Sequence, residues 1–156
     1  MKHITTYIFA VALLLLLPGC KKDNWIDWKT QNTVWLANNG TKDGVIVTPT
    51  GLQYKVIRQG HPGTKPDDLK TVQINISGRL ITGHVFQEQC TITSEVSSLI
   101  YGMQEGLKKM NKSGIYTFYI PYNLGYGSSA QANQGIEINV PPYSTLIFEV
   151  ELLDVY

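Results

Sequence analysis

Cysteine is scarce in this sequence, which has only Cys20 and Cys90 among its 156 residues. Two cysteines allow at most one disulfide, so a disulfide-stabilised scaffold is excluded, and they cannot supply a four-thiolate zinc site. An excess of either charge is also missing, because 13 basic residues face 12 acidic ones. A dedicated nucleic-acid binder would show a clustered basic excess, so we expect no nucleic-acid partner.

Motifs for metals, phosphates and cofactors are missing as well. The chain has no glycine-rich phosphate loop and no HExxH or EF-hand pattern. Of the three histidines, His3 lies in the N-terminal segment, and His61 and His84 each lack a second ligand at metal-binding spacing. We therefore expect both at the surface, with no metal and no cofactor. The length suits one domain, and a hydrophobic fraction of 43% suffices for a packed core.

A long hydrophobic run occurs only near the start, from Ile8 to Leu17. Ten residues are too few to span a bilayer, which takes about 20 in a helix. Behind the basic Lys2, the run suits a secretory signal. It ends in Leu17-Pro18-Gly19-Cys20, which resembles a bacterial lipobox, where the cysteine is lipidated and becomes the mature N-terminus. The alternative is a buried helix with an incidental cysteine. We expect a signal peptide over residues 1–19 and lipid attachment at Cys20.

Processing at this position changes the charge and the thiol count. Removal of residues 1–19 takes away only Lys2, leaving 12 basic and 12 acidic residues. If Cys20 is acylated, Cys90 has no disulfide partner. We expect Cys90 to be a half-buried thiol without a catalytic role.

Residues 20–45 are expected to form a lipid-anchored tether followed by a short aromatic helix. Trp25, Trp28 and Trp35 fall on one broad helical face, and Asn38-Asn39-Gly40 is a plausible stop. The helix either packs on the main domain or provides a dimer or partner contact, since three tryptophans are many for a short segment.

Residues 46–156 are dominated by strand patterns. Apolar and polar residues alternate from Thr71 to Leu80, as in a half-buried antiparallel strand. One helix interrupts the strands and is expected from Leu99 to Met110, whose apolar residues recur at helical spacing. A long stretch from Pro121 to Tyr143 lacks periodicity and is expected to be a functional loop. Further strands are expected at Gly51–Arg58, at His84–Glu88, around Tyr116–Ile120 and around Leu146–Leu152.

These patterns predict an α+β fold but no reaction. The short motifs and their order point to a function, because from about Gly51 to Tyr156 they resemble those of the FKBP-type peptidyl-prolyl isomerases. The resemblance implies a twisted antiparallel β-sheet wrapped around one short α-helix, with an apolar pocket between them. The motifs are Gly51-Leu52-Gln53-Tyr54, Ser77-Gly78-Arg79-Leu80, Val85-Phe86, Glu105-Gly106-Leu107, Leu124-Gly125-Tyr126-Gly127 and Val140-Pro141-Pro142 with Ser144–Leu153.

The resemblance implies roles for individual residues. Tyr126 matches a tyrosine whose hydroxyl bonds a substrate carbonyl, and Ile100 matches a residue whose backbone N–H bonds another. Phe86 matches a pocket-wall phenylalanine, and with Tyr126 and Ile100 it forms the expected catalytic set. The expected substrate-binding residues are Ile76, Gln87, Leu99, Met103, Val140 and Phe148.

Three of these positions depart from the family pattern. Ile76 replaces a tyrosine, Gln87 replaces an aspartate, and Met103 replaces a tryptophan that commonly floors the pocket. Ile76 and Met103 keep the pocket apolar, whereas Gln87 removes one polar anchor.

Two functions follow from the resemblance. The first is a peptidyl-prolyl cis-trans isomerase of weak activity, which assists folding of exported proteins in the cell envelope, anchored to a membrane and facing periplasm or cell surface. Its partners would be proline-containing polypeptides. The second is a non-catalytic peptide-binding or chaperone module on the same fold. In either case the aromatic helix could mediate a homodimer.

Overall fold

The computed structural model describes residues 25–128, 131–133 and 136–156. The expected signal peptide and the lipidation of Cys20 lie outside these residues. The helices are α1 (Ile26–Gly40), the 3₁₀ helix η1 (Val96–Ser98), α2 (Tyr101–Leu107) and the 3₁₀ helix η2 (Tyr122–Leu124). The strands are β1 (Val45–Val47), β2 (Gln53–Arg58), β3 (Thr71–Arg79), β4 (Val85–Glu95), β5 (Ile115–Ile120), β6 (Gln131–Asn133), β7 (Ile136–Val140) and β8 (Leu146–Val155).

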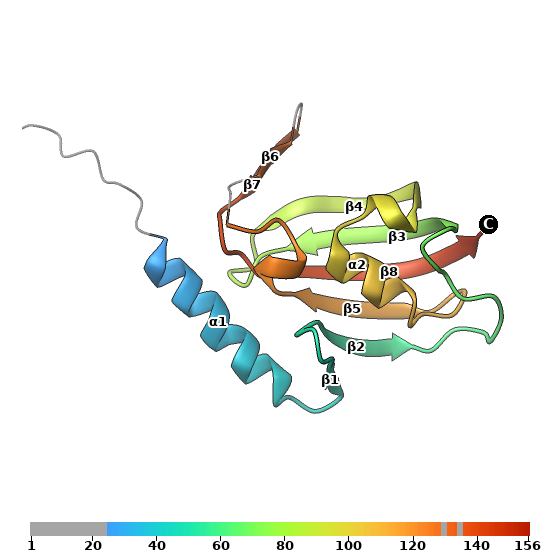
Figure 1. Cartoon of the computed structure of the whole chain (residues 1–156), viewed down its shortest axis with the longest axis horizontal. Helices are drawn as coiled ribbons and strands as arrows, with labels where there is room; N and C mark the ends of the chain where they lie inside the picture. The colour runs from blue at the N-terminus through green and yellow to red at the C-terminus, as the bar shows by residue number, and fades with distance from the viewer. Residues whose placement is uncertain (1–24, 129–130, 134–135) are drawn as a thin grey trace, which may run out of the picture.

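The main sheet is antiparallel and has six strands in the order β1-β2-β5-β8-β3-β4. A separate pair, β6–β7, stands away from it (Figure 1). Burial alternates strictly along β3, where Val72, Ile74 and Ile76 are buried and their neighbours are partly exposed. This two-residue period follows from the pleat, which turns successive side chains to opposite faces. The predicted α+β architecture is confirmed.

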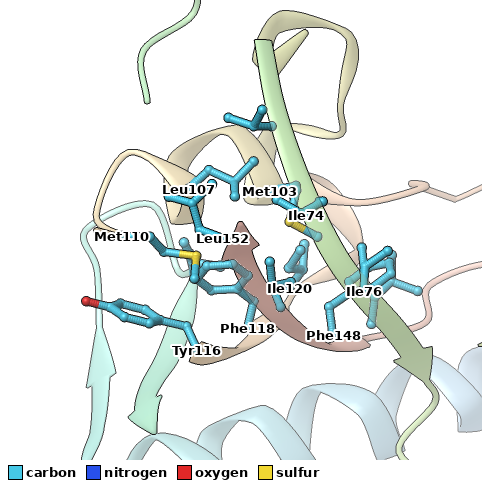
Figure 2. Packing of buried hydrophobic residues seen from close by; sticks show 14 of the residues in the cluster. Ile74, Ile76, Met103, Leu107, Met110, Tyr116, Phe118, Ile120, Phe148 and Leu152 are labelled. Atoms are coloured by element: carbon cyan, nitrogen blue, oxygen red, sulfur yellow. The ribbon is translucent and has the colours of Figure 1, made fainter. Parts of the chain in front are cut away.

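The apolar core lies between the sheet and α2, which crosses one sheet face (Figure 1). Two glycines bring α2 close to β5. A Cβ atom at Gly102 would lie 2.4 Å from Ile120 Cγ2, and one at Gly106 would lie 2.6 Å from Phe118 Cε1. Phe118 and Ile120 are fully buried in this core, where Figure 2 shows them with Leu107 and Met110.

Helix α1 packs on the opposite face of the sheet. Tyr119 alternates with the core-facing residues of β5, so its ring points away from α2, and it lies 5.8 Å from the Trp35 ring. Near the end of the same helix, Asn39 Nδ2 donates a 2.9 Å hydrogen bond to Gln53 Oε1 of β2. The expectation of a helix packed on the main domain is therefore confirmed, and the predicted stop at Gly40 is correct.

Three element boundaries differ from those expected. Helix α2 begins at Tyr101, because Leu99 and Ile100 are extended, with ψ angles of 166° and 149°. Leu99 and Ile100 are apolar at helical spacing because they pack against the core, although their backbone is not helical. The strand expected at His84–Glu88 continues as β4 to Glu95, paired with β3 along its length. The expected loop from Pro121 to Tyr143 contains η2, β6 and β7.

Other expectations concern single residues. His61 and His84 are both exposed, and Cys90 is a free, partly buried thiol, all as predicted. Within the described ranges, no helix has the length and apolar character needed to cross a membrane.

Candidate active site

Five of the predicted site residues meet in one buried cluster. Strands β3, β4, β7 and β8 and helix α2 each contribute a side chain, and each is at most 7% exposed. The rings of Phe86 and Phe148 meet edge to face, with centroids 5.3 Å apart, a favoured aromatic geometry. Figure 2 shows three members, Ile76, Met103 and Phe148, on neighbouring elements. The members are Ile76, Phe86, Met103, Val140 and Phe148.

Gly78 makes the aromatic contact possible, and sequence reasoning assigned it no role. It pairs with Phe148 across β3 and β8. A Cβ atom there would lie 2.7 Å from Phe86 Cζ and 2.9 Å from Phe148 Cε1. A side chain at this position would therefore push the two rings apart. The sequence contained Gly78 within the Ser77-Gly78-Arg79-Leu80 motif. The reason for a glycine there is seen only in the structure, where the Phe86 and Phe148 rings occupy the space of a side chain.

Tyr126 lies at the rim of this cluster, in the turn after η2. Gly127 follows it with a φ of 78°, a left-handed conformation that glycine adopts without strain. The Tyr126 ring packs against the cluster and is half-buried. Burial raises the pKa of its hydroxyl above the ordinary value. Among the described residues, this hydroxyl has no hydrogen-bond partner, so it remains a protonated donor available to a ligand.

A second donor comes from the start of α2. Ile100 precedes the helix in an extended conformation, and its carbonyl accepts from the N–H groups of Met103 and Gln104 at 2.9 and 3.0 Å. Its own N–H has no partner in the part of the chain that the structure describes. The side chains of Leu99 and Ile100 are partly buried and pack against the cluster. The extended backbone thus presents an unused N–H beside an apolar surface.

Gln87 is not brought into the cluster. Its Nε2 donates to the Glu88 carbonyl at 3.0 Å and lies 3.4 Å from Cys90 Sγ. A bulge in β4 causes this contact, because three residue steps from Gln87 to Cys90 oppose two steps on β3. The Gln87 amide is therefore engaged within its own strand, and its role in lining the pocket stays a prediction.

Sequence reasoning also missed a group of polar residues behind the site. Asn32 of α1 is only 2% exposed, and Ser144 and Thr145, before β8, are similarly buried. The Thr145 N–H donates to Asn32, and Trp28 of the same helix donates to Ser144, in each case across more than a hundred residues of sequence. No sequence signal identified this group, because a single asparagine in a helix is usually a surface residue.

The arrangement is a buried apolar wall with two hydrogen-bond donors, one hydroxyl and one N–H, at its edge. Such a site suits an amide-containing ligand with an apolar ring, since apolar surface holds the ring and the donors hold carbonyl oxygens. Among the described residues, no three His, Cys, Asp or Glu side chains gather closely enough to hold a metal ion.

An antiparallel sheet around one short helix, with this apolar site between them, is the fold of one class of folding enzymes. Residues 63–153 match the family described as FKBP-type peptidyl-prolyl cis-trans isomerase. The chain belongs to this family. Residues 21–56 match the domain found amino-terminal to FKBP-type peptidyl-prolyl isomerases, so that domain includes α1, β1 and part of β2.

Similar proteins come from several bacteria. A probable FKBP-type peptidyl-prolyl cis-trans isomerase FkpA of Neisseria meningitidis is 37% identical over 131 residues, covering 81% of this chain and 46% of the relative. The outer membrane protein MIP of Legionella longbeachae is 34% identical, covering 81% and 54%. The chain thus spans about half the length of these relatives.

Solved structures agree in fold. The crystal structure of FkpA from Escherichia coli has a TM-score of 0.75 at 34% identity, covering 83% of this chain and 59% of that one. A peptidyl-prolyl cis-trans isomerase from Pseudomonas syringae also has a TM-score of 0.75, at 25% identity, covering 84% of this chain and 95% of that one.

Proposed function

We propose that this protein is a peptidyl-prolyl cis-trans isomerase that acts on proline-containing polypeptides in the cell envelope. One observation carries the proposal: the Tyr126 hydroxyl and the Ile100 N–H, neither with a partner among the described residues, belong to residues that pack against the buried core containing Phe86, Met103 and Phe148. Family membership supports the same activity.

The reaction is a rotation and transfers no atoms. An X–Pro amide must twist through a state without amide resonance, over a barrier of roughly 18–20 kcal/mol. The twisted amide is less polar than the planar one, so an apolar site binds the twisted form better than the ground state. In our proposal Phe86, Val140 and Phe148 form the wall, and Ile76, Leu99 and Met103 complete the apolar surface.

The two donors would fix the peptide while the bond turns. The Tyr126 O–H would donate to one substrate carbonyl and the Ile100 N–H to another. When both carbonyls are held, rotation about the X–Pro bond is the main motion left to the peptide. This restriction raises the rate, because the peptide is already oriented for the reaction. We expect the activity to be modest, because the Gln87 amide is engaged with Glu88 and Cys90 and Met103 is a flexible wall.

A protease-coupled assay on a proline tetrapeptide tests the activity. We expect micromolar full-length protein to accelerate cis-to-trans conversion above the spontaneous rate. A rate equal to the spontaneous one would overturn the proposal.

We further propose that the protein works as an envelope lipoprotein, anchored through Cys20 and facing the periplasm or the cell surface. The Legionella longbeachae relative is named an outer membrane protein, which supports this location. Its substrates there would be exported proteins during folding.

The second candidate is a non-catalytic peptide-binding or chaperone module. The engagement of Gln87 favours it, because the site then has fewer free polar anchors for a reacting peptide. Suppression of aggregation that survives Tyr126→Phe, in a protein without isomerase activity, would support this second function.

A homodimer through α1 remains part of the proposal. Trp28 and Trp35 contact the chain's own Ser144 and Tyr119, so a dimer would have to use other residues, such as Val34, which is 53% exposed. Sedimentation velocity on the wild type and on Val34→Glu tests it. A monomeric wild type would exclude the homodimer.

A further inference from the structure

Helix α1 holds the turn between β7 and β8 through buried and partly buried hydrogen bonds. Trp28 Nε1 donates to Ser144 Oγ at 3.0 Å, and Ser144 Oγ donates to the Pro141 carbonyl at 2.7 Å. The Thr145 N–H donates to Asn32 Oδ1 at 2.7 Å. We call the group of Trp28, Asn32, Ser144 and Thr145 the α1 clamp.

Three of the four clamp residues are closed to solvent, and Trp28 is partly buried. Asn32, Ser144 and Thr145 are 2%, 3% and 1% exposed. Asn32 Nδ2 also donates to the Trp28 carbonyl at 2.8 Å, so the amide is oriented from both ends. A buried polar group that loses its partner is costly, so these bonds specify one position of the turn relative to the helix.

The only side-chain bond within the described turn is the one from Ser144 Oγ to the Pro141 carbonyl, and Ser144 Oγ is itself held by Trp28. Pro141 and Pro142 lack backbone N–H groups, so neither can donate within the turn. Tyr143 adopts a φ of 62°, which is unusual for a residue with a side chain and persists only where surrounding structure imposes it. Tyr143 is held by the Gly127 carbonyl and by the Tyr122 ring, and the bonds from α1 hold the next two residues, Ser144 and Thr145.

The clamped turn is continuous with the candidate active site. Val140 precedes it, and Phe148 follows on β8. The Tyr143 N–H donates to the Gly127 carbonyl at 3.0 Å, and Gly127 is the neighbour of Tyr126. The Gly127 N–H in turn donates to the Tyr122 carbonyl at 2.8 Å. A displacement of the turn therefore moves Val140 directly and moves Tyr126 through one hydrogen bond.

We propose that Asn32 and Trp28 are positioning residues of the isomerase site, acting through the turn on the Tyr126 hydroxyl and the Val140 wall. This inference rests on the proposed function. It makes α1 part of the catalytic unit: Trp28 packs against the same buried core as the candidate site, while Trp35 and Asn39 contact the sheet face opposite α2.

Asn39 offers a matched control for Asn32. It lies on the same helix, is equally buried at 2% exposure, and donates to Gln53 of β2 at 2.9 Å, far along the helix from the turn. Asn32→Ala and Asn39→Ala each remove one buried amide from α1. Both are expected to lower the unfolding midpoint in urea, so loss of stability alone cannot separate them.

The test measures kcat/KM for a proline tetrapeptide in the full-length protein, below the unfolding transition of every variant. We expect Asn32→Ala to lower kcat/KM about 10-fold, since a displaced catalytic group is costly. Asn39→Ala is expected to stay within about twofold of wild type. The ring ¹³C resonances of Tyr126 should shift in Asn32→Ala and remain in place in Asn39→Ala. Equal kinetic losses in both variants, or equal shifts, would overturn the inference.

Two further outcomes are also decisive. If the wild type has no isomerase activity, the proposed function fails, and the Tyr126 resonances alone decide whether the clamp positions this residue. If Asn32→Ala does not fold, Trp28→Phe and Ser144→Ala replace it. Trp28→Phe removes only the bond from Trp28 Nε1 to Ser144 Oγ, whereas Ser144→Ala removes this bond together with the one from Ser144 Oγ to the Pro141 carbonyl. Their effects on kcat/KM should be non-additive if they act through the shared Trp28–Ser144 bond, and additive effects would overturn the inference.

Discussion

Ile100 shows how a single backbone group can carry function. Its φ of −61° matches the angle that proline imposes, and the preceding Leu99 is extended, as a residue before proline prefers. Ile100→Pro therefore removes the N–H without straining the backbone. This position can test the donor in a way that ordinary side-chain substitution cannot.

We expect Ile100→Pro to lower kcat/KM about 3- to 10-fold, the value of one net hydrogen bond. Ile100→Val is the control, because it keeps the N–H and most of the apolar side chain. The measurement is the tetrapeptide assay on both variants. Equal activities in the two variants would show that the Ile100 N–H does not bind substrate.

The pKa of Tyr126 predicts a pH profile. Burial favours the neutral hydroxyl and raises its pKa above the ordinary value near 10. The donor is therefore present at lower pH and is lost only as pH rises through the raised pKa. We expect kcat/KM to be flat from about pH 6 to about pH 9. A decline centred within this range, seen with wild type and absent in Tyr126→Phe, would contradict this assignment.

Several site residues could be predicted one by one, because each lies in a short recognisable motif. Phe86 and Val140 lie in the buried core and Tyr126 packs against that core, while their roles at a site stay predictions. The engagement of Gln87 could not be predicted, since it depends on a bulge in β4 that alternation does not reveal. Asn32 could not be predicted either, because its partner Thr145 is distant in sequence.

At the scale of the element, α2 depends on two glycines that face β5. Alanine at Gly106 would gain about 1 kcal/mol in helix propensity. Its Cβ would lie 2.6 Å from the ring of Phe118, which is fully buried and held on all sides. Overpacking of this kind costs about 1–3 kcal/mol, so the steric cost is the larger effect.

We therefore expect Gly106→Ala to lower the free energy of unfolding by about 1–2 kcal/mol in urea titrations. Gly63→Ala is the control, since nothing lies within 4 Å of its Cβ position. Stability of Gly106→Ala at or above wild type would contradict the close packing of α2 on β5.

Elements were predicted well where buried and exposed residues alternate, as along β3. They were predicted poorly where buried residues of an extended segment happen to have helical spacing. Leu99 and Ile100 share the spacing of α2 residues because they pack on the same core, yet their backbone is extended. Strand β4 is longer than expected: its second half is only partly buried, yet Cys90 and Ile92 pack against the core and the pairing with β3 continues to Glu95.

At the scale of the whole molecule, two segments from opposite ends of the described chain form one unit. Helix α1 lies beside the sheet, whereas α2 crosses one sheet face (Figure 1), and hydrogen bonds join the first helix to the turn before β8. The helix was predicted from its tryptophans, but its attachment to this turn needed the folded structure.

The location of the whole protein is tested through Cys20. We expect wild type to fractionate with membranes and Cys20→Ser to be released into the soluble fraction, because the anchor that we propose is the lipidated Cys20 alone. Cys90→Ser is the control and should remain with the membrane, since Cys90 is a partly buried thiol within the folded domain. Membrane association of Cys20→Ser would contradict lipid anchoring at this position.

The central claim is that the buried apolar cluster and the Tyr126 hydroxyl together catalyse rotation about X–Pro bonds. NMR exchange spectroscopy on a proline tetrapeptide tests it most directly, because the cis and trans signals report the rate without a coupled protease. We expect micromolar wild type to speed the exchange, and Tyr126→Phe to lower that acceleration about 3- to 10-fold through loss of one hydrogen bond. Exchange at the spontaneous rate with wild type, or equal acceleration by Tyr126→Phe, would contradict the account.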